Sequence, residues 1–431
     1  MNRLPIYMMR AAATAVALPL LLGPLPAQAS DWPQFRGAHR DGLSDEKGLL
    51  RAWPQTGPKE AWRRPIGPGY SGVAVAGGRL YTMFAEDGDE GQGFAAALDP
   101  ATGKEIWRVA VAKRLDTQFG NGPRATPTVD KDVVYVMGSR GTVMALAAKD
   151  GAARWKLELA DAFSSKVPTW GHTASVVVDG GKVILEAGGP GEGKSYAGID
   201  AASGKVLWTS GNGPSEAGYM SPLVVDLAGV HQYVYVMGAP DGPPGGGAPP
   251  MSALRSVDAS GKELWSLPWP SGETHATPVL VPPDRLFVSG VEGIGGAMLK
   301  VKKDAGKLAV EEIWKNPMFR THFNAAVLHG DHLYGFDNTT LKCISVKDGS
   351  IAWAKRGLGK GSLIEADGLL MVLSDDGRLL LVEANPASYT EKGSVQALKP
   401  EGGRAWTPPT LSGGRVYVRN HAELVAYDVK G

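Results

Sequence analysis

The residues of this sequence that could bind a ligand recur at one position of a repeated segment. Eight segments begin with a small residue or with one that carries a hydroxyl or amide group, and the position two residues earlier holds unusual side chains. In chain order that position is occupied by Gly69, Arg124, His172, Tyr219, His275, His322, Lys360 and Ala405. Three of the eight histidines of the chain fall on it, well above random expectation. Tyr70, Asn324 and Trp406 lie within two residues of the same position.

This mixture of side chains suits a polar or anionic small ligand. A guanidinium binds a carboxylate or phosphate through two parallel hydrogen bonds, and a lysine ammonium adds a point charge. The alternative is that these side chains only fill the centre of the molecule and bond to loop carbonyls. Burial and like-charge repulsion both disfavour an imidazolium beside arginine and lysine. We therefore expect the histidines to be neutral at pH 7.

A zinc site is the other chemistry that these histidines could provide, because three imidazoles are a common ligand set for zinc. His172, His275 and His322 belong to the third, fifth and sixth segments, however. Their backbones start from separate parts of the fold, so we expect no metal site.

A recurring tryptophan defines the elements that position these residues. It follows a tight turn, and five of its six copies stand four residues after a glycine, as in Asp99-Pro100-Ala101-Thr102-Gly103-Lys104-Glu105-Ile106-Trp107. The six copies are Trp107, Trp155, Trp208, Trp265, Trp314 and Trp353. A period of about 40–50 residues built on strands and turns is typical of a β-propeller with one blade per repeat.

Counting the strands that carry this tryptophan predicts an all-β, eight-bladed propeller. Trp62 adds a copy before the first unit, and a degenerate copy without tryptophan lies near Glu391–Val395. The last unit, Trp406 to Val429, contains only three strands. Glu60 to Arg64 should supply its fourth strand, which joins the two ends of the chain in one blade and removes the open sheet edges. Seven blades is the alternative count.

The chain divides into three predicted parts. Residues 1–29 resemble a secretory signal peptide, with Arg3 and Arg10, the apolar run Ala11–Leu22 and a small-residue cleavage site. Residues 30–58 form an N-terminal arm on the outside or base of the propeller, which spans 59–431. Two insertions interrupt the repeats, Lys113–Gly122 and the Pro/Gly-rich Ala239–Ser252. We expect a periplasmic or secreted protein without a membrane anchor.

Charge and cysteine content exclude several functions. The chain has 45 basic and 44 acidic residues, so it shows no electrostatic footprint for nucleic acid. Cys343 is the only cysteine, which rules out an intrachain disulfide, a thiolate metal cluster and covalent haem attachment.

The repeat from Ala97 to Trp107 resembles the tryptophan-docking repeat of the PQQ-like propellers, the family of the quinoprotein dehydrogenases and of the outer-membrane assembly factor BamB. The segments Asp31–Gly37 and Phe119–Pro127 resemble an exported bacterial subgroup of it. The resemblance implies that Trp62 and the six repeated tryptophans dock neighbouring blades. For the dehydrogenases it implies PQQ with calcium, but the chain lacks their paired cysteines and an acidic cluster for calcium and a catalytic base. It also lacks the lipid-bearing cysteine of the assembly factor.

We therefore expect a binding or interaction module with a polar pocket in the central funnel and no catalytic centre or cofactor of its own. Its partner would be a small polar or anionic ligand or another envelope protein, and the protein would be a monomer. A small PQQ-dependent oxidoreductase acting on alcohols or sugars and an envelope assembly scaffold are the two alternatives.

Overall fold

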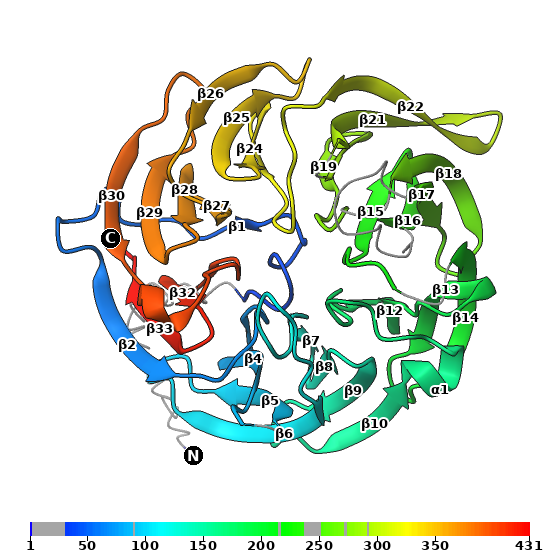
Figure 1. The fold of residues 1–431 in the computed structure, drawn as a ribbon, viewed down its shortest axis with the longest axis horizontal. Coiled ribbons are helices and arrows are strands. Elements are labelled where there is room, and N and C mark those ends of the chain that lie inside the picture. Colours follow the sequence, from blue (N-terminus) through cyan, green and yellow to red (C-terminus); the bar gives the residue numbers. More distant parts are fainter. Residues whose placement is uncertain (2–30, 89–90, 214–216, 237–250, 271–273, 291–292) are drawn as a thin grey trace.

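The structure is a computed structural model that describes Met1 and residues 31–88, 91–213, 217–236, 251–270, 274–290 and 293–431. The expected signal peptide therefore lies outside the described residues, as does nearly all of the Ala239–Ser252 insertion. Eight sheets stand around one central axis (Figure 1). The all-β, eight-bladed propeller is thus confirmed, and the count of seven is excluded.

Every blade is a four-stranded antiparallel meander, except that blade 7 carries one additional strand. From the inner to the outer strand, blades 1 to 4 comprise β3 (Ala74–Ala76), β4 (Arg79–Ala85), β5 (Gln92–Leu98) and β6 (Glu105–Lys113); β7 (Thr128–Asp130), β8 (Val133–Met137), β9 (Thr142–Ala147) and β10 (Ala153–Glu158); β11 (Val177–Asp179), β12 (Lys182–Glu186), β13 (Gly191–Asp200) and β14 (Val206–Gly213); and β15 (Leu223–Leu227), β16 (Val230–Val236), β17 (Met251–Val257) and β18 (Glu263–Pro270).

Blades 5 to 8 follow the same order. They comprise β19 (Val279–Val281), β20 (Arg285–Gly290), β21 (Gly295–Asp304) and β22 (Lys307–Asn316); β23 (Val327–His329), β24 (His332–Asp337), β25 (Thr340–Ser345) and β26 (Ile351–Lys355); β27 (Ser362–Ala366), β28 (Leu369–Leu373), β29 (Arg378–Glu383) and β30 (Glu391–Gln396); and β31 (Thr410–Ser412), β32 (Arg415–Arg419), β33 (Glu423–Asp428) and β2 (Lys59–Pro65). One short helix, α1 (Leu159–Phe163), follows β10, and a 3-10 turn spans Pro400–Gly402.

The two ends of the propeller meet in blade 8. β2 pairs antiparallel with β33, and Trp62 stands opposite Ala426, as the strand count predicted. The apolar side chains of this blade continue into blade 1, where Leu80 and Leu98 pack in one cluster with Tyr417 and Leu424. Strands such as β8 are buried along their whole length because each blade is covered by a neighbour on both faces. The core is therefore a series of apolar layers between blades.

The repeated tryptophans lie between blades. The ring of Trp62 covers Gly103 of the next blade so closely that a β-carbon there would lie 2.7 Å from it. Gly151, Gly204, Gly261 and Gly349 lie in the same way under Trp107, Trp155, Trp208 and Trp314. Five indole N–H groups donate to a carbonyl of the following blade at 2.8–3.0 Å: Trp62 to Pro100, Trp107 to Ala148, Trp155 to Ala201, Trp314 to Val346 and Trp353 to Asn385. Trp265 instead donates to Gln232 of its own blade.

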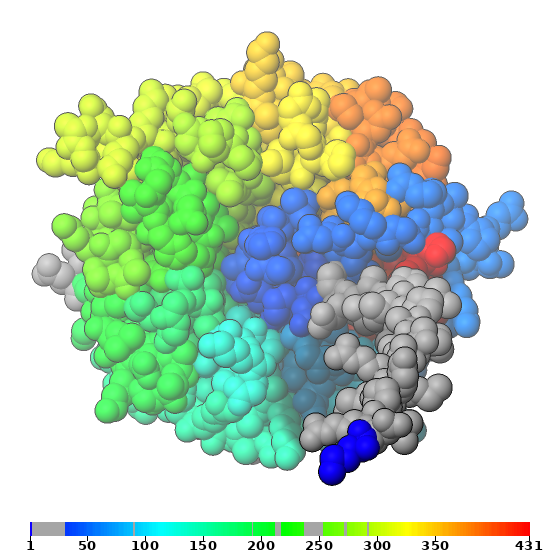
Figure 2. Space-filling model, turned by 180° about the vertical axis from the view of Figure 1, so that it is seen from behind, coloured from blue at the N-terminus to red at the C-terminus, as the bar shows by residue number. Residues whose placement is uncertain are grey.

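Residues 31–58 cross one face of the propeller, and Figure 2 shows the medium-blue start of this segment over the middle of that face. Trp32 forms a β-bridge with Val75 of blade 1. Further along, β1 (Leu43–Ser44) pairs parallel with the inner strand β27. The arm therefore lies on the base of the propeller, across the central channel. In the part of the chain that the structure describes, no helix is long and apolar enough to span a membrane.

Candidate functional site

Hydroxyl groups that join neighbouring blades fix the start of several inner strands. The backbone N–H of Thr126 donates to the Ser175 hydroxyl, and that of Ser175 donates to the Ser221 hydroxyl, both at 2.9 Å. Such bonds between blades explain why these segments begin with small hydroxyl residues. Because each inner strand enters at the same height, the side chain two residues earlier faces the mouth of the channel.

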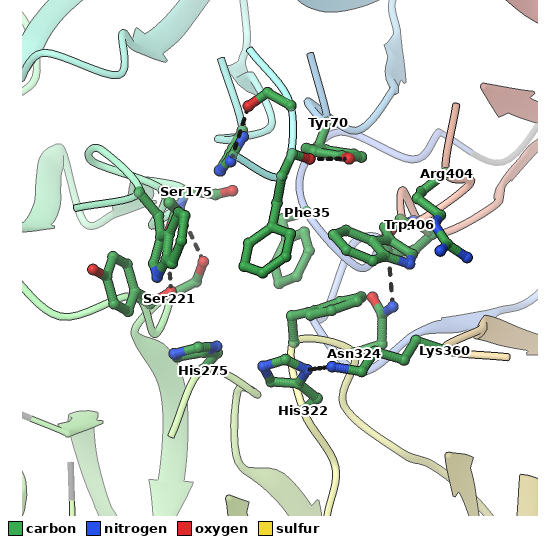
Figure 3. Close-up of a pocket in the computed structure, with 18 of the residues that line it drawn as sticks. Phe35, Tyr70, Ser175, Ser221, His275, His322, Asn324, Lys360, Arg404 and Trp406 are labelled. Atoms are coloured by element: carbon green, nitrogen blue, oxygen red, sulfur yellow. Dashed lines mark hydrogen bonds between the residues drawn. The ribbon is translucent and has the colours of Figure 1, made fainter. Parts of the chain in front are cut away.

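A pocket of about 800 Å³ opens at this mouth (Figure 3). Eight of the nine residues that the sequence indicated line it: Tyr70, Arg124, Tyr219, His275, His322, Asn324, Lys360 and Trp406. His172 does not. Its backbone N–H donates to Ser139 at 2.9 Å, and its ring lies beside Gly141, so the side chain is buried against a turn of blade 2. Burial lowers the pKa of His172 to about 4.

Aromatic rings form much of the pocket wall. Tyr70 stacks on Trp406 with ring centroids 5.5 Å apart, and Phe323 lies 5.1 Å from the same indole. Phe119 packs against Trp170 at 5.0 Å. Phe119 belongs to the predicted insertion at 113–122, and the Tyr70 hydroxyl donates to its carbonyl at 2.5 Å. The insertion thus carries an exposed aromatic ring over the pocket.

Several lining residues were missed by the sequence reasoning because they lie off the repeated position. They are Phe35, Gln118, Phe119, Gly120, Trp170, Thr173, Ser175, Ser221, Gly403, Arg404, Pro408 and His421. The Phe119–Pro127 segment was noticed only as a family resemblance, and Phe35 as part of the arm. Ser221 could have been found, since it stands two residues after Tyr219 at the predicted start of its segment, whereas Ser175 stands three residues after His172 and breaks that spacing.

Arg124 is a half-buried cation with unused hydrogen-bonding capacity. Its Nη2 donates to the Thr117 hydroxyl at 3.0 Å and to the Gly120 carbonyl at 3.2 Å. Its guanidinium carbon lies 5.1 Å from the centre of the Tyr70 ring. Its Nη1 is buried and has no hydrogen-bond partner among the described residues. Burial lowers the pKa of Arg124, with Tyr70 and Tyr219 acting in the opposite direction.

Lys360 and two histidines form a second polar side of the pocket. The Lys360 ammonium lies 3.1 Å from Nδ1 of His322, so it donates to a neutral imidazole whose hydrogen is on Nε2. Burial and the Lys360 charge lower the pKa of His322 to about 3. His322 also stacks on His275 at 5.3 Å. For His172 and His322, the expectation of neutral imidazoles is therefore confirmed.

The far side of the pocket holds a polar cluster that is already paired. The Trp406 indole N–H donates to Asp375 at 2.9 Å, and Arg404 pairs with the other oxygen of that carboxylate at 2.7 Å. His421 lies edge-on to Tyr70 with ring centroids 4.3 Å apart. Burial, together with the charges of Arg419 and Arg124, lowers the pKa of His421 to about 4. Asp375 thus orients Trp406 and is committed to two donors.

One family model matches this chain, described as outer membrane protein assembly factor BamB, over residues 91–355. The chain belongs to this family. No curated protein sequence matches it.

Solved structures of enzymes and of an assembly factor share the fold of this BamB-family chain. The quinohemoprotein alcohol dehydrogenase from Comamonas testosteroni is 14% identical with a TM-score of 0.67, over 93% of this chain and 81% of that one. BamB from Moraxella catarrhalis is 14% identical with a TM-score of 0.59, over 86% and 99%. A europium-containing methanol dehydrogenase is 13% identical with a TM-score of 0.64, over 90% and 89%. At such identities the likeness shows the fold alone.

The pocket fits PQQ and calcium unequally. PQQ is planar and carries three carboxylates, which suit aromatic walls with Arg124 and Lys360. Calcium requires six to eight oxygen ligands, mostly carboxylates and carbonyls. None of the described lining residues carries a carboxylate, and no cluster of three or more His, Cys, Asp or Glu that could hold a metal occurs in the described ranges. The residues present thus do not fit calcium.

Proposed function

We propose that this propeller is a binding module whose central pocket takes a small, planar, anionic ligand. The main support for this proposal is the set of residues that line the pocket. Stacked aromatic rings surround Arg124 and Lys360, and no described lining residue carries a carboxylate. Flat rings favour a flat ligand through dispersion and offset stacking. Two cations without a facing carboxylate favour a negative charge on that ligand.

The unpartnered nitrogen of Arg124 adds a directional argument. A buried donor without an acceptor costs about 1–3 kcal/mol, and a ligand carboxylate or phosphate would remove that cost. The same contact would offset the desolvation that lowers the pKa of this guanidinium. A donor without an acceptor lowers the stability of the free protein but can bind an anionic group of the ligand.

The ionisation of the pocket supports binding over acid–base catalysis. A general base works best with a pKa near the working pH, whereas the pKa values of His322 and His421 are lowered to about 3 and 4. Asp375 is held by two donors. The pocket therefore presents no group among these that is poised to take a proton from a substrate near neutral pH.

Fluorescence titration with 8-anilinonaphthalene-1-sulfonate, a planar aromatic anion, tests the proposal. We expect saturable binding that Lys360→Met weakens about tenfold and that Lys347→Met, on an exposed hairpin of blade 6, leaves unchanged. Benzoate, phosphate and PQQ with and without calcium serve as competitors. Equal affinity of the two lysine variants for every compound would overturn the proposal. Quinone-dependent dye reduction with an alcohol would favour the oxidoreductase alternative.

Family membership supports one other candidate, a scaffold that binds an envelope protein through its outer surface. Together with the leader-like residues 1–29, it supports a location outside the cytoplasm. Pull-down from an envelope extract distinguishes the two, because a surface scaffold should retain its partner when Lys360 is replaced by Met. Loss of that partner would instead connect it with the pocket.

A further inference from the structure

We propose that the N-terminal arm is part of the ligand site, with Phe35 as the floor of the pocket and with Arg36 and Arg40 as the residues that hold it in position. This inference rests on the proposed binding function. It assigns a role to the Asp31–Gly37 segment, which otherwise stood out only as a motif.

The arm separates two cavities of the central channel. Phe35 lines the 800 Å³ pocket at the mouth and lies near the middle of the ring of side chains in Figure 3. Its neighbours Gln34 and Ala38 line a second cavity of about 530 Å³ on the base side. The two cavities share no lining residue. A ligand in the upper pocket therefore meets the arm, and Phe35 is the arm residue that it meets.

Arg36 ties the arm to blade 6. Its side chain is 6% exposed, and its two terminal nitrogens donate to the carbonyls of Ala325 and Ala326 at 2.9 and 2.7 Å. These residues directly follow Asn324, which itself lines the pocket. The arm is thereby held at the depth where the inner strand of blade 6 leaves the pocket.

Arg40 ties the arm to the opposite side of the channel. It is 3% exposed and donates to the carbonyls of Ser175 and Val176 of blade 3 at 3.3 and 3.4 Å, and to the side chain of Gln34 at 3.1 Å. Ser175 lines the pocket directly. Two buried guanidiniums thus span the channel from blade 3 to blade 6, with Phe35 adjacent to the first of them.

The backbone between these ties is a tight, fixed loop. Arg36 and Arg40 have φ angles of 63° and 60°, a left-handed conformation that costs a non-glycine residue about 1–2 kcal/mol. Gly37 has a φ of 84°, and a β-carbon there would lie 3.1 Å from the Trp32 ring. Trp32 exchanges two 2.8 Å backbone hydrogen bonds with Val75. A loop held in this way presents Phe35 as a preorganised surface.

Cysteine protection tests the assignment, with the Phe35→Cys variant as the reporter. Cys343 is fully buried, and burial raises its pKa to about 11, so the wild-type thiol is an unreactive background. We expect the new thiol to react with N-ethylmaleimide and saturating 8-anilinonaphthalene-1-sulfonate to slow that reaction at least tenfold. Ala38→Cys, on the same arm but facing the other cavity, should react at an unchanged rate.

Two further variants test the positioning role. Arg36→Ala in the Phe35→Cys background should reduce the protection to below threefold, whereas Arg51→Ala, which removes an exposed arm arginine paired with Asp367, should preserve it. If Arg36→Ala lowers the melting temperature too far for labelling, Phe35→Leu replaces it. That variant should bind the probe at least fivefold more weakly without a change in melting temperature.

The outcomes separate this inference from the function it rests on. In one outcome, the thiol of Phe35→Cys does not react. In another, it is labelled equally fast with and without the probe, although binding of the probe still depends on Lys360. Either result would overturn the role of the arm and leave the binding function standing. Failure of the wild-type protein to bind the probe would overturn both. Equal protection of the thiols in Phe35→Cys and Ala38→Cys would also overturn the inference, because the arm would then not divide the channel.

Discussion

Buried arginines in this protein are satisfied by carbonyl oxygens more than by carboxylates. Arg36, Arg40 and Arg419 are each less than a tenth exposed, and burial lowers their pKa values to about 10, 9 and 9. Arg419 donates to six acceptors, whereas Arg124 retains a buried nitrogen without a partner among the described residues. A buried donor without an acceptor is costly. Arg40 also keeps a buried Nε without a partner among the described residues, so what distinguishes Arg124 is that it lines the pocket, whereas the other nitrogens of Arg40 hold the arm to blade 3.

Replacing Arg124 with methionine should separate binding from stability. We expect affinity for 8-anilinonaphthalene-1-sulfonate to fall at least tenfold, about 1.4 kcal/mol. The melting temperature should stay level or rise, because the change removes a desolvated donor and keeps the apolar volume. Arg140→Met, at an exposed arginine of blade 2, is the matched control. A lower melting temperature with unchanged affinity would show that Arg124 is structural.

His172 should make the protein sensitive to acid. Its pKa is lowered to about 4 in the folded state against about 6.5 in an unfolded chain. The unfolded state therefore binds more protons between these values, and stability decreases as the pH falls below 6.5. From pH 6.5 to 5 this single group should cost about 2 kcal/mol. Urea unfolding of His172→Gln should show a smaller loss over this range, and an identical slope would contradict the assignment.

At the scale of elements, the unit that repeats is a tryptophan on one blade and a glycine on the next. Glycine is required at this position for two reasons. Gly103 has a φ of 71°, and the Trp62 ring leaves no room for a β-carbon there. This pairing explains why the spacing within the repeat is kept while the strand sequences vary. The contact between blades 6 and 7 does not depend on the tryptophan that blade 7 lacks, because Trp353 of blade 6 donates to the Asn385 carbonyl of blade 7.

Two glycine substitutions in blade 1 can measure the docking contact. Gly78 has a φ of 73° with nothing within 4 Å of an added β-carbon, so Gly78→Ala should cost about 1–2 kcal/mol from backbone strain alone. Gly103→Ala has nearly the same backbone angle and must also displace the indole, which should add about 1–3 kcal/mol. Chemical denaturation of both variants gives the difference. Equal losses of unfolding free energy in the two variants would mean that the Trp62 ring can move aside without destabilising the protein.

At the scale of the molecule, one seam closes the ring, and Arg419 lies in it. From β32 of blade 8 its guanidinium reaches the carbonyls of Gly67, Gly69, Ser71 and Met83 on the blade 1 side. The seam therefore joins residues 336 to 352 positions apart in the chain, in addition to the β2–β33 pairing.

Arg419→Met should destabilise the whole ring. Several buried carbonyls would lose their donor at about 1 kcal/mol or more each, so we expect a loss on the order of 3 kcal/mol or more and a single, earlier unfolding transition. Arg415→Met, which removes a part-exposed arginine of the same strand paired with Asp428, should cost well under half of that. If the two variants lose a comparable free energy of unfolding, Arg419 has no special role in closing the ring.

The sequence by itself determined the number of blades, the strand that closes the ring of blades and most of the residues that it indicated for the central pocket. These follow from the period of the repeat, because residues in the same phase of identical blades occupy the same height around one axis. Five residues of that phase line the pocket, and three of their near neighbours in the chain, Tyr70, Asn324 and Trp406, line it as well. The domain boundaries at residues 29 and 58 stay predictions.

Only the tertiary structure decided where side chains outside the repeat would go. His172 lies one residue out of phase, because Ser175 and not Ala174 is the counterpart of Thr126 and Ser221 in the bonds between blades. Thr173 therefore lines the pocket, and His172 bonds to Ser139 of blade 2. Phe35 and Phe119 lie outside the repeated segments. The arm and the insertion bring them to the pocket through contacts such as that of Arg36 with Ala325, 289 residues away. A periodic pattern encodes positions relative to the axis, whereas such single, long-range contacts leave no local signature in the chain.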